Sequence, residues 1–448
     1  MMAPIDATTA RTAQEFVNLL AERLSDPASV AEAIRAKPRE GAGRAVVHWD
    51  PRALADGCPG MALFFGALQG YRPDAPNVAH AYLAAAISSE CPSPTDSLFY
   101  GVPSVAFAAR AVERRPGDYA ELLSVADEQV AACAESLLSL DEPRVRSGIA
   151  GVPMPIYDVV SGLSGLGRYL LACGEGQRSL TERIMRHLVA LTRPVVLRGH
   201  SVPGWWTPDS HPEGLFDVGL AHGISGPLAL LSIAYEKGIR VQGHERAIRT
   251  IVEWLLARRG HDEHGPYWPA TISTEHEISP SAAGPPARAG WCYGAPGVSR
   301  ALFLASRALK EPQWCDAALD TLCSVLRRPP AQQYIHDATM CHGAAGLTRI
   351  VHLMARDAVG HAGSDELAAA LPGCIANIVA RAAPEHPFVW DSQGAWGEDG
   401  SYRSDERAHR PGYLDGAAGV ALTLHACLEP DEDEAHGSLP WDAALLLR

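Results

Sequence analysis

A short unit, Gly-x-x-Gly followed by an apolar run, recurs along the chain and limits the folds that the chain can adopt. Six copies are intact, and a seventh has Ser104 in place of its second glycine. The first glycines of the copies are Gly57, Gly101, Gly162, Gly223, Gly294, Gly343 and Gly416. Successive copies start 44 to 73 residues apart, which leaves room for an apolar helix, a loop and a second helix. We therefore expect seven helix pairs.

The two helices of each pair differ in polarity. Residues 224–234 after the fourth turn are apolar almost all round, and a helix without a polar face is buried on all sides. The second helices, such as 119–138 and 244–258, keep one polar face. This alternation predicts an all-α fold, an α/α toroid of seven inner and seven outer helices. The glycines permit positive φ and close backbone approach, and we expect their turns at one mouth of the toroid.

We expect a single α/α-barrel domain over residues 1–448. Residues 1–50 are predicted as a helical lead-in, 51–428 as the seven repeats, and 429–448 as an acidic turn and a C-terminal segment. Strand signals are sparse, and the two short candidates are 45–48 and 193–197. Long loops rich in Pro, Gly and Trp precede several inner helices, at 199–217, 261–290 and 384–410. Long loops inside a compact protein are usually functional.

The overall charge and the N-terminus exclude some classes of protein. A net charge of −14 argues against a nucleic acid as the main partner, because phosphate binding needs a basic surface. Residues 12–24 form an amphipathic pattern rather than the basic and apolar regions of a signal peptide. No apolar run reaches the length of a transmembrane helix. We therefore expect a cytoplasmic protein that is not integral to a membrane.

Two of the ten cysteines differ from the others in context. Most are scattered through apolar helical segments, where they are expected to be buried small side chains. Cys292 lies two residues before Gly294, and Cys341 with His342 immediately precedes Gly343. The sequence shows no obvious fourth ligand, and three protein ligands with an open position are typical of catalytic zinc. We expect one zinc ion per chain.

Other turns carry polar residues as well. Asp158 lies four residues before Gly162, His222 directly before Gly223, and Asp415 directly before Gly416. On a toroid these residues would converge at the mouth that carries the cysteines. No single one of them identifies a chemistry, and the spaced set is the stronger signal.

Two motifs point to a known family. Trp-Cys-Tyr-Gly-x-x-Gly at 291–297, followed by Cys-His-Gly-x-x-Gly at 341–346, resembles the lanthionine synthetase C-like family. That family comprises the cyclases of lanthipeptide biosynthesis and their glutathione-binding relatives. The resemblance extends from Asp56-Gly57 to residues 441–447, and the chain has the length of a stand-alone class I cyclase. Only the degenerate turn at Ser104 departs from the pattern, and it is remote in sequence from the metal motifs.

The resemblance implies an activity and a set of residues. The activity is addition of peptide Cys thiols to dehydroalanine or dehydrobutyrine, which forms a thioether ring. Cys292, Cys341 and His342 would be the zinc ligands. His222 would exchange the proton, Asp158 would orient His222 and raise its pKa, Arg288 would stabilise the enolate, and Tyr293 would position or share the proton. The implied partners are a dehydrated precursor peptide with its leader, a dehydratase and an export transporter.

Three other functions remain open at this point. The same zinc site could activate glutathione against dehydroamino acids. A toroid hydrolase or lyase acting on glycans would instead use carboxylates, for which Asp158 and Asp415 are the candidates. A scaffold with a structural zinc would need a fourth ligand, such as His336 or Asp337. Aromatic residues of the long loops could line a peptide groove or pack the loops, and they are Trp205, Trp206, Tyr267 and Trp268.

Overall fold

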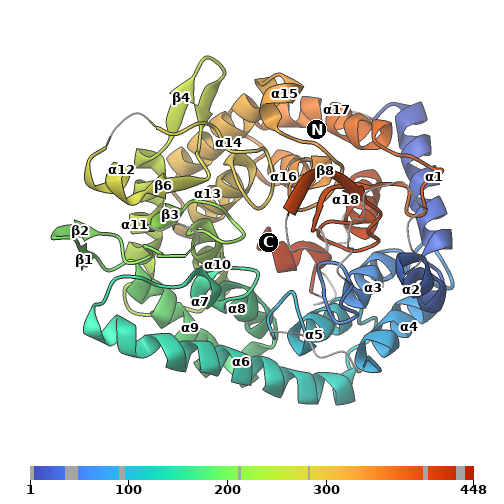
Figure 1. Ribbon diagram of the computed structural model, residues 1–448, viewed down its shortest axis with the longest axis horizontal. Coiled ribbons are helices and arrows are strands. Elements are labelled where there is room, and N and C mark those ends of the chain that lie inside the picture. The colour runs from blue at the N-terminus through green and yellow to red at the C-terminus, as the bar shows by residue number, and fades with distance from the viewer. Residues whose placement is uncertain are drawn as a thin grey trace. The chain divides into compact units, whose positions relative to one another are not determined.

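A computed structural model describes most of the chain as helices with short hairpins between them (Figure 1). The described residues are 5–35, 49–89, 96–209, 213–280, 283–396, 402–429 and 439–448. The predicted strand at 45–48 and most of the predicted acidic turn lie outside these residues.

Helices account for most of the described residues. The helix predicted at 244–258 spans His244–Ala257, whereas the one predicted at 119–138 spans Ala120–Ser147 and ends nine residues later than expected. The α-helices are α1 (Ala7–Arg23), α2 (Pro27–Arg35), α3 (Cys58–Ala67), α4 (Ala75–Ile87), α5 (Val102–Ala111), α6 (Ala120–Ser147), α7 (Met154–Tyr157), α8 (Leu163–Ala172), α9 (Arg178–Leu191), α10 (Ser225–Glu236), α11 (His244–Ala257), α12 (Thr274–Ile278), α13 (Ala295–Leu309), α14 (Pro312–Arg327), α15 (Pro330–Gln333), α16 (Ala344–Asp357), α17 (Ser364–Ala380) and α18 (Ala417–Leu428). Two 3-10 helices are η1 (Gly174–Gln177) and η3 (Trp441–Leu445). The amphipathic segment predicted at 12–24 is α1, whose first turn is capped by the Asp6 side chain.

Short antiparallel strand pairs occupy parts of the three long segments predicted as loops. The strands are β1 (Val195–Leu197), β2 (His200–Val202), β3 (Leu215–Asp217), β4 (Gly260–Asp262), β5 (Gly265–Tyr267), β6 (Thr271–Ser273), β7 (Ser392–Trp396) and β8 (Tyr402–Ala408). They pair as β1 with β2, β3 with β6, β4 with β5 and β7 with β8. The prediction of extended structure at 193–197 is therefore confirmed by β1, and each of the three predicted loops contains short paired strands.

Residue contacts group the chain into two compact units. The first contains Met1–Ser124, Ile335–His352 and Ala368–Trp441. The second contains Val125–Tyr334, Leu353–Leu367 and Asp442–Arg448. The division of residues 1–448 that the sequence suggested stays a prediction.

A buried helix follows each of the seven turns, as predicted. These helices are α3, α5, α8, α10, α13, α16 and α18. Residues Ser225–Tyr235 of α10 are all buried, whereas α11 buries only one face. In the second unit α8 packs on α9, α10 on α11 and α13 on α14 (Figure 1). The last pair is formed differently from the prediction: α18 packs against α1, from the N-terminal lead-in, and no second α-helix follows it among the described residues.

The turns supply partners for the first N–H groups of the buried helices. The N–H of Ile224 donates to the carbonyl of Asp217, which lies six residues before Gly223. The N–H of Ala344 donates in the same way to the carbonyl of Asp337, and the N–H of Ala417 donates to the carbonyl of Arg410. A helix that begins inside the protein needs such partners, because its first four N–H groups have none within the helix. The recurring sequence unit is therefore a recurring hydrogen-bonded turn.

Neighbouring turns are also joined to each other through the carbonyl two residues before the first glycine. In the second unit the N–H of Val159 donates to Ala221 O at 2.9 Å, and the N–H of Leu220 donates to Cys292 O at 3.0 Å. In the first unit the N–H of Cys341 donates to Leu414 O at 2.9 Å, and the N–H of Leu414 to Ala55 O at 2.8 Å. These bonds fix the turns relative to one another within each unit.

Glycine is required in these turns mainly because of close approach. A Cβ at Gly343 would lie 2.2 Å from Thr339 N, and one at Gly294 would lie 2.0 Å from Arg288 O. Positive φ, predicted for the first glycines generally, occurs in this set at Gly101 (71°) and Gly294 (92°) among the described residues. At Gly57 and Gly162 the backbone is extended.

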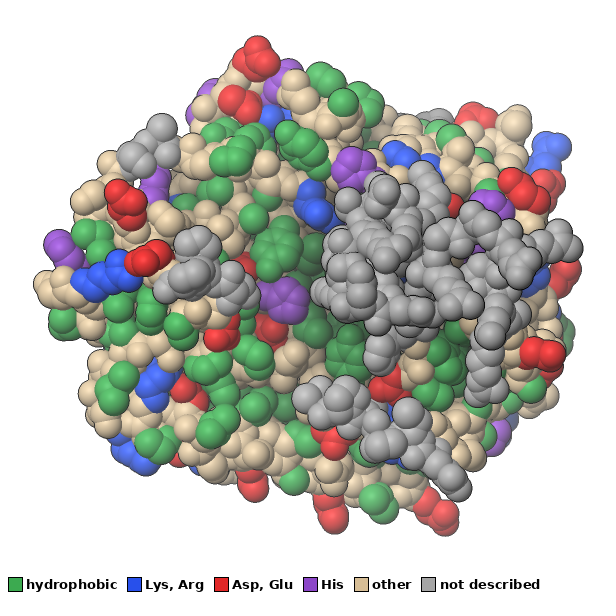
Figure 2. Space-filling view, viewed as in Figure 1, with side chains coloured by type: hydrophobic (Ala, Val, Ile, Leu, Met, Phe, Trp, Pro, Cys, Tyr) green, Lys and Arg blue, Asp and Glu red, His purple; other side chains and the backbone are tan. Residues whose placement is uncertain are grey.

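Charged side chains are spread over the face drawn in Figure 2. Lys and Arg side chains of the described residues occur there in small, separate groups rather than as one continuous basic surface. None of the helices among the described residues has the length and apolar character that crossing a membrane requires.

Arg300 in α13 is a fully buried charge. Its Nη2 lies 2.7 Å from Asp357 Oδ2, and its Nε donates to the carbonyl of Leu447 at 2.7 Å. Burial lowers the pKa of the guanidinium to about 10. Without this side chain, Asp357 Oδ2 and the carbonyl of Leu447 would each lose a hydrogen-bond donor.

We expect Arg300→Met to lower the free energy of unfolding by about 2–3 kcal/mol, because Asp357 Oδ2 and the carbonyl of Leu447 lose a buried donor, while Arg356 still pairs with Asp357 Oδ1. Denaturant unfolding of the purified variant measures this loss. Arg307→Met is the matched control on the same helix, since Arg307 pairs with Glu236 at the surface. Its loss should stay below about 1 kcal/mol. Equal losses in the two variants would contradict the assignment of Arg300 as a core ion pair.

Candidate functional site

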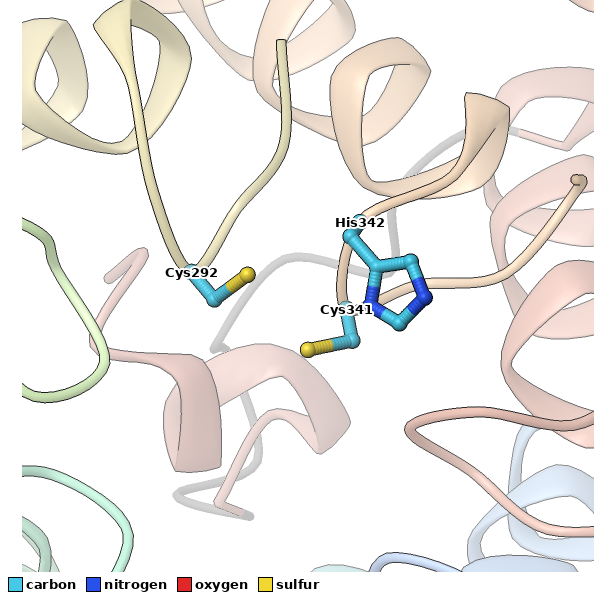
Figure 3. A group of neighbouring side chains, drawn as sticks. All are labelled: Cys292, Cys341 and His342. Atoms are coloured by element: carbon cyan, nitrogen blue, oxygen red, sulfur yellow. The ribbon is translucent and has the colours of Figure 1, made fainter. Parts of the chain in front are cut away.

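Cys292, Cys341 and His342 lie together. One ligand atom from each residue falls within 4.8 Å of the others, and among the described residues no further His, Cys, Asp or Glu joins this group. The two sulfur atoms point toward each other from the turns that precede α13 and α16, and the imidazole ring lies beside Cys341 (Figure 3).

This donor set fits zinc. Tetrahedral zinc with sulfur and nitrogen ligands places its ligand atoms roughly 3.5–3.8 Å apart, which is compatible with the observed spread. Two carboxylates flank His342, because Asp337 Oδ2 lies 3.8 Å from Nε2 and Asp415 Oδ1 lies 3.7 Å from Nδ1. Such carboxylates orient a histidine ligand. His336, the other fourth ligand considered from the sequence, is exposed and outside the group.

Both cysteines occupy the same position of the repeated turn, two residues before the first glycine. The carbonyl of Cys292 accepts from the N–H groups of Leu220 and Ala221, and the N–H of Cys341 donates to Leu414 O. The backbone of each cysteine is therefore held by the bonds that join neighbouring turns. The assignment of both cysteines as zinc ligands stays a prediction, which their proximity supports.

His222 is joined to Asp158, as predicted. Its Nδ1 lies 2.7 Å from Asp158 Oδ2, and the other oxygen of this carboxylate accepts the N–H of Ser161 at 2.7 Å. The Asp158 side chain is 2% exposed, whereas that of His222 is 37% exposed. Burial alone would lower the pKa of His222, but the hydrogen bond and charge of Asp158 outweigh it and raise the pKa above its ordinary value. Asp217 and Cys292 act in the same direction.

Tyr293 is joined to a second buried carboxylate, which the sequence analysis did not identify. Its hydroxyl donates to Asp217 Oδ2 at 3.0 Å, and Asp217 Oδ1 accepts the N–H of Gly219 at 2.8 Å. Burial raises the pKa of Asp217 to about 6, and its two hydrogen bonds oppose that rise. Asp217 lies six residues before its glycine, where Asp337 also stands in its own turn. That shared spacing is the signal that could have identified it.

Arg288 lies apart from these pairs. Its side chain is exposed and makes no hydrogen bond or ion pair with any residue that the structure describes. Its carbonyl oxygen would lie 2.0 Å from a Cβ placed at Gly294. The role of Arg288 in stabilising an enolate stays a prediction.

Asp415 lies beside a further carboxylate that the sequence analysis missed, Asp56. Both stand directly before the first glycine of their turns. Burial, together with the charge of Asp415, raises the pKa of Asp56 to about 7. Asp415 Oδ2 also lies 3.8 Å from Arg410 Nη1. Asp158 and Asp415, the candidates for glycan chemistry, are thus each adjacent to a basic side chain.

The aromatic residues of the loops mainly pack the loops. Trp205 and Trp268 are 1% and 0% exposed, and the Trp268 indole donates to the carbonyl of Leu255. The Trp206 indole donates to Thr274 Oγ1. The structure therefore favours loop packing over a peptide groove for these side chains.

Comparisons with known proteins agree with the motifs. The sequence model of the lanthionine synthetase C-like protein family matches residues 48–446, which is most of the chain. The nisin biosynthesis protein NisC of Lactococcus lactis subsp. lactis is 27% identical over 278 residues. That alignment covers 58% of this chain and 63% of NisC, so it spans less than two thirds of that relative.

The solved structure of a nisin cyclase is similar over 99% of this chain and 98% of its own, with a TM-score of 0.72. The sequence identity is 21%, so this likeness speaks for the fold alone. It confirms the predicted fold class, an all-α helical toroid.

Replacing Asp158 with Asn should lower the pKa of His222. The variant removes the hydrogen-bonded charge that does most to raise this pKa, so burial, which disfavours the imidazolium, is opposed only by the weaker effects of Asp217 and Cys292. The pKa of His222 should therefore fall relative to the parent. Titration of the His222 Cε1–H resonance by NMR measures the change. His276→Gln, which removes an exposed histidine of α12, serves to assign background signals, and an unchanged His222 pKa in Asp158→Asn would contradict the pairing.

Proposed function

Because the chain belongs to the lanthionine synthetase C-like family, we propose that it is a zinc-dependent lanthipeptide cyclase. Its reaction is intramolecular addition of peptide Cys thiols to dehydroalanine or dehydrobutyrine. The observation that carries the proposal is the group of Cys292, Cys341 and His342 next to family motifs, in a chain that also pairs His222 with Asp158. The predicted cytoplasmic location stays part of this proposal.

Cys292, Cys341 and His342 would hold the metal. A zinc ion bound there lowers the pKa of a thiol that it coordinates and so presents a thiolate, the nucleophilic form of cysteine, at neutral pH. Asp337 and Asp415 flank the imidazole and would keep its ring oriented.

His222 is the proposed group for proton transfer. Its Nδ1 is engaged by Asp158, which leaves Nε2 for the substrate. The raised pKa favours the protonated ring, which is the form that a general acid needs. The thiol S–H bond is broken, the new bond joins sulfur to the β-carbon, and a proton is delivered to the α-carbon. The reaction therefore consumes no net proton.

Arg288 and Tyr293 have supporting roles in this proposal. Attack at the β-carbon builds negative charge on the carbonyl oxygen of the dehydro residue, and a positioned cation or donor stabilises such charge. The exposed Arg288 side chain has no partner among the described residues and is free to move toward a peptide. Tyr293 lies beside His222, with ring centroids 6.3 Å apart.

A dehydrated precursor peptide with its leader is the proposed substrate, and a dehydratase and an export transporter are the proposed partners. The likeness to a protein named for nisin biosynthesis favours a peptide thiol over glutathione as the nucleophile. No observation favours the glycan hydrolase or the scaffold with a closed metal site.

Incubation with a dehydrated, Cys-containing peptide should reduce the number of free thiols without changing the peptide mass. Ring closure is an isomerisation, so alkylation followed by mass spectrometry is needed to count the remaining thiols. We expect each closed ring to remove one alkylation adduct.

Glutathione added to the same assay separates the two thiol donors. A glutathione mass increment in place of a lost adduct would support the glutathione-adding alternative. The cyclase proposal would be contradicted if all peptide thiols could still be alkylated after incubation with zinc-loaded protein.

Cys292→Ala and Cys341→Ala should each lose bound zinc, because two ligands hold the metal much more weakly than three. Metal analysis of purified protein should give one zinc per chain for the parent and a small fraction of that for the variants. Cys315→Ala is the matched control, since Cys315 is equally a buried cysteine but lies outside the ligand group. Retention of full zinc by Cys292→Ala would remove that residue from the ligand set.

A further inference from the structure

The indole of Trp291 anchors the turn that carries Cys292. Trp291 directly precedes Cys292 and is 0% exposed. Its Nε1 donates to the carbonyl of Leu445 at 2.9 Å. Its own carbonyl packs against α13, since a Cβ at Gly297 would lie 2.3 Å from this oxygen. The residue before the first proposed metal ligand is therefore held through both its side chain and its main chain.

Trp291 occupies a position of the repeated turn that holds a side chain without a hydrogen-bond donor in most other turns. The position lies three residues before the first glycine and is buried in all seven turns. The turns without a donor there carry Leu54, Leu98, Val159, Leu220 and Met340. Tyr413 is the other exception, and its hydroxyl donates to the carbonyl of Trp441 at 3.1 Å. Both donors at this position thus bind main chain from residues 441–448.

The segment that accepts the bond from Trp291 is Asp442–Arg448, which we call the core segment. It belongs to the second unit, and its residues 442–447 are each 0% exposed. Three of its carbonyls accept a buried side-chain donor of that unit: Leu445 from Trp291, Leu447 from Arg300 Nε at 2.7 Å, and Arg448 from Arg168 Nε at 3.0 Å. Leu446, between two of these carbonyls, has a φ of 54°, which a leucine keeps only where its surroundings impose it. The core segment is therefore a fixed support.

We propose that Trp291 is a positioning residue of the zinc site, which holds Cys292 in place through its bond to the core segment. This inference rests on the proposed zinc site and deepens it, since it adds a support that is not itself a ligand. The Cys292 carbonyl is held from the neighbouring turn by the N–H groups of Leu220 and Ala221. The indole bond holds the preceding residue to a different part of the chain. Two separate supports fix the backbone from which the thiolate extends.

Loss of the indole donor weakens the metal site because the ligands are then less well ordered before zinc binds. A site whose ligands are already in place binds more tightly, since less ordering is needed at the moment of binding. Groups that support a ligand from outside the coordination sphere change metal affinity about 10- to 100-fold when they are removed. Trp291→Phe keeps an aromatic ring and removes the N–H, so the carbonyl of Leu445 loses this donor.

The first test measures zinc affinity by competition with a chromophoric chelator. We expect Trp291→Phe to raise the Kd for zinc about tenfold. The cobalt-substituted variant should also show shifted ligand-field absorption bands, because these bands respond to the geometry of the metal ligands. An unchanged Kd would overturn the inference, and so would cobalt bands identical to those of the parent.

Trp268→Phe is the matched control, which separates positioning from a general loss of stability. Trp268 is also 0% exposed, lies in the same unit, and donates from its indole to the main-chain carbonyl of Leu255 at 2.8 Å. Trp268→Phe should lower the thermal unfolding temperature of the metal-free protein, as Trp291→Phe does, but should leave the Kd for zinc at the parental value. An equal rise of the Kd in the two variants would contradict a specific role for Trp291.

A second variant acts on the core segment from its other end. Arg448 Nε donates to Asp442 Oδ1 at 2.6 Å, and the Arg448 side chain is 14% exposed, so its replacement disturbs folding less than a fully buried change. Arg448→Met should raise the Kd for zinc severalfold. Combined with Trp291→Phe, it should add little, because both act through the core segment. A parental Kd in Arg448→Met, or a double variant whose rise is the product of the single ones, would overturn the inference.

Hydrogen exchange followed by mass spectrometry tests the support of Cys292 without zinc. The N–H groups of Leu220 and Ala221 donate to the Cys292 carbonyl, so their exchange reports how firmly this turn is held. In metal-free protein they should exchange faster in Trp291→Phe than in Trp268→Phe, and equal rates would overturn the inference. If the parent binds no zinc, the proposed function fails, while these rates still decide whether Trp291 holds the turn.

Discussion

The structure depends on one main-chain hydrogen bond, which the carbonyl two residues before each turn's first glycine accepts from a neighbouring turn. Ala221 and Cys292 play this part in the second unit, and Ala55 and Leu414 in the first. The helices behind the turns are buried on all sides, so every main-chain group at their ends needs a partner. Such bonds recur because the turns share one backbone conformation. The repeated glycines permit it, as the 2.3 Å from a Cβ at Gly416 to Gly412 N illustrates.

Because the turns share one backbone conformation, the position of a residue within its turn determines where its side chain lies. The residue two before the glycine is Cys292 or Cys341, and the residue one before it is His222, Tyr293 or His342. Side chains at these positions leave equivalent points of equivalent turns, and within the second unit this brings the charges of His222 and Cys292 within range of each other. Carboxylates further back in the turn then orient them. The backbone of the turns is constant, and the residue types at a few variable positions determine the chemistry.

Features that are local and periodic could be predicted from the sequence. The apolar helices, the turns and the metal-type ligands are of this kind, because each is defined within about ten residues. The spacing of Asp217 from its glycine is local as well, but its partner could not be predicted this way, since Tyr293 lies 76 residues later. The strand β8 was missed because Tyr402–Ala408 contains four charged residues and owes its conformation to pairing with β7. The pairing of α18 with α1 joins opposite ends of the sequence, which no local pattern reveals.

The balance of protons limits what the proposed reaction asks of the protein. Addition of a thiol across a carbon–carbon double bond releases one proton from sulfur and requires one at the α-carbon. A single residue that takes and returns a proton would therefore be sufficient. His222, whose pKa is raised by the hydrogen bond and charge of Asp158 against the effect of burial, is the residue proposed for both steps.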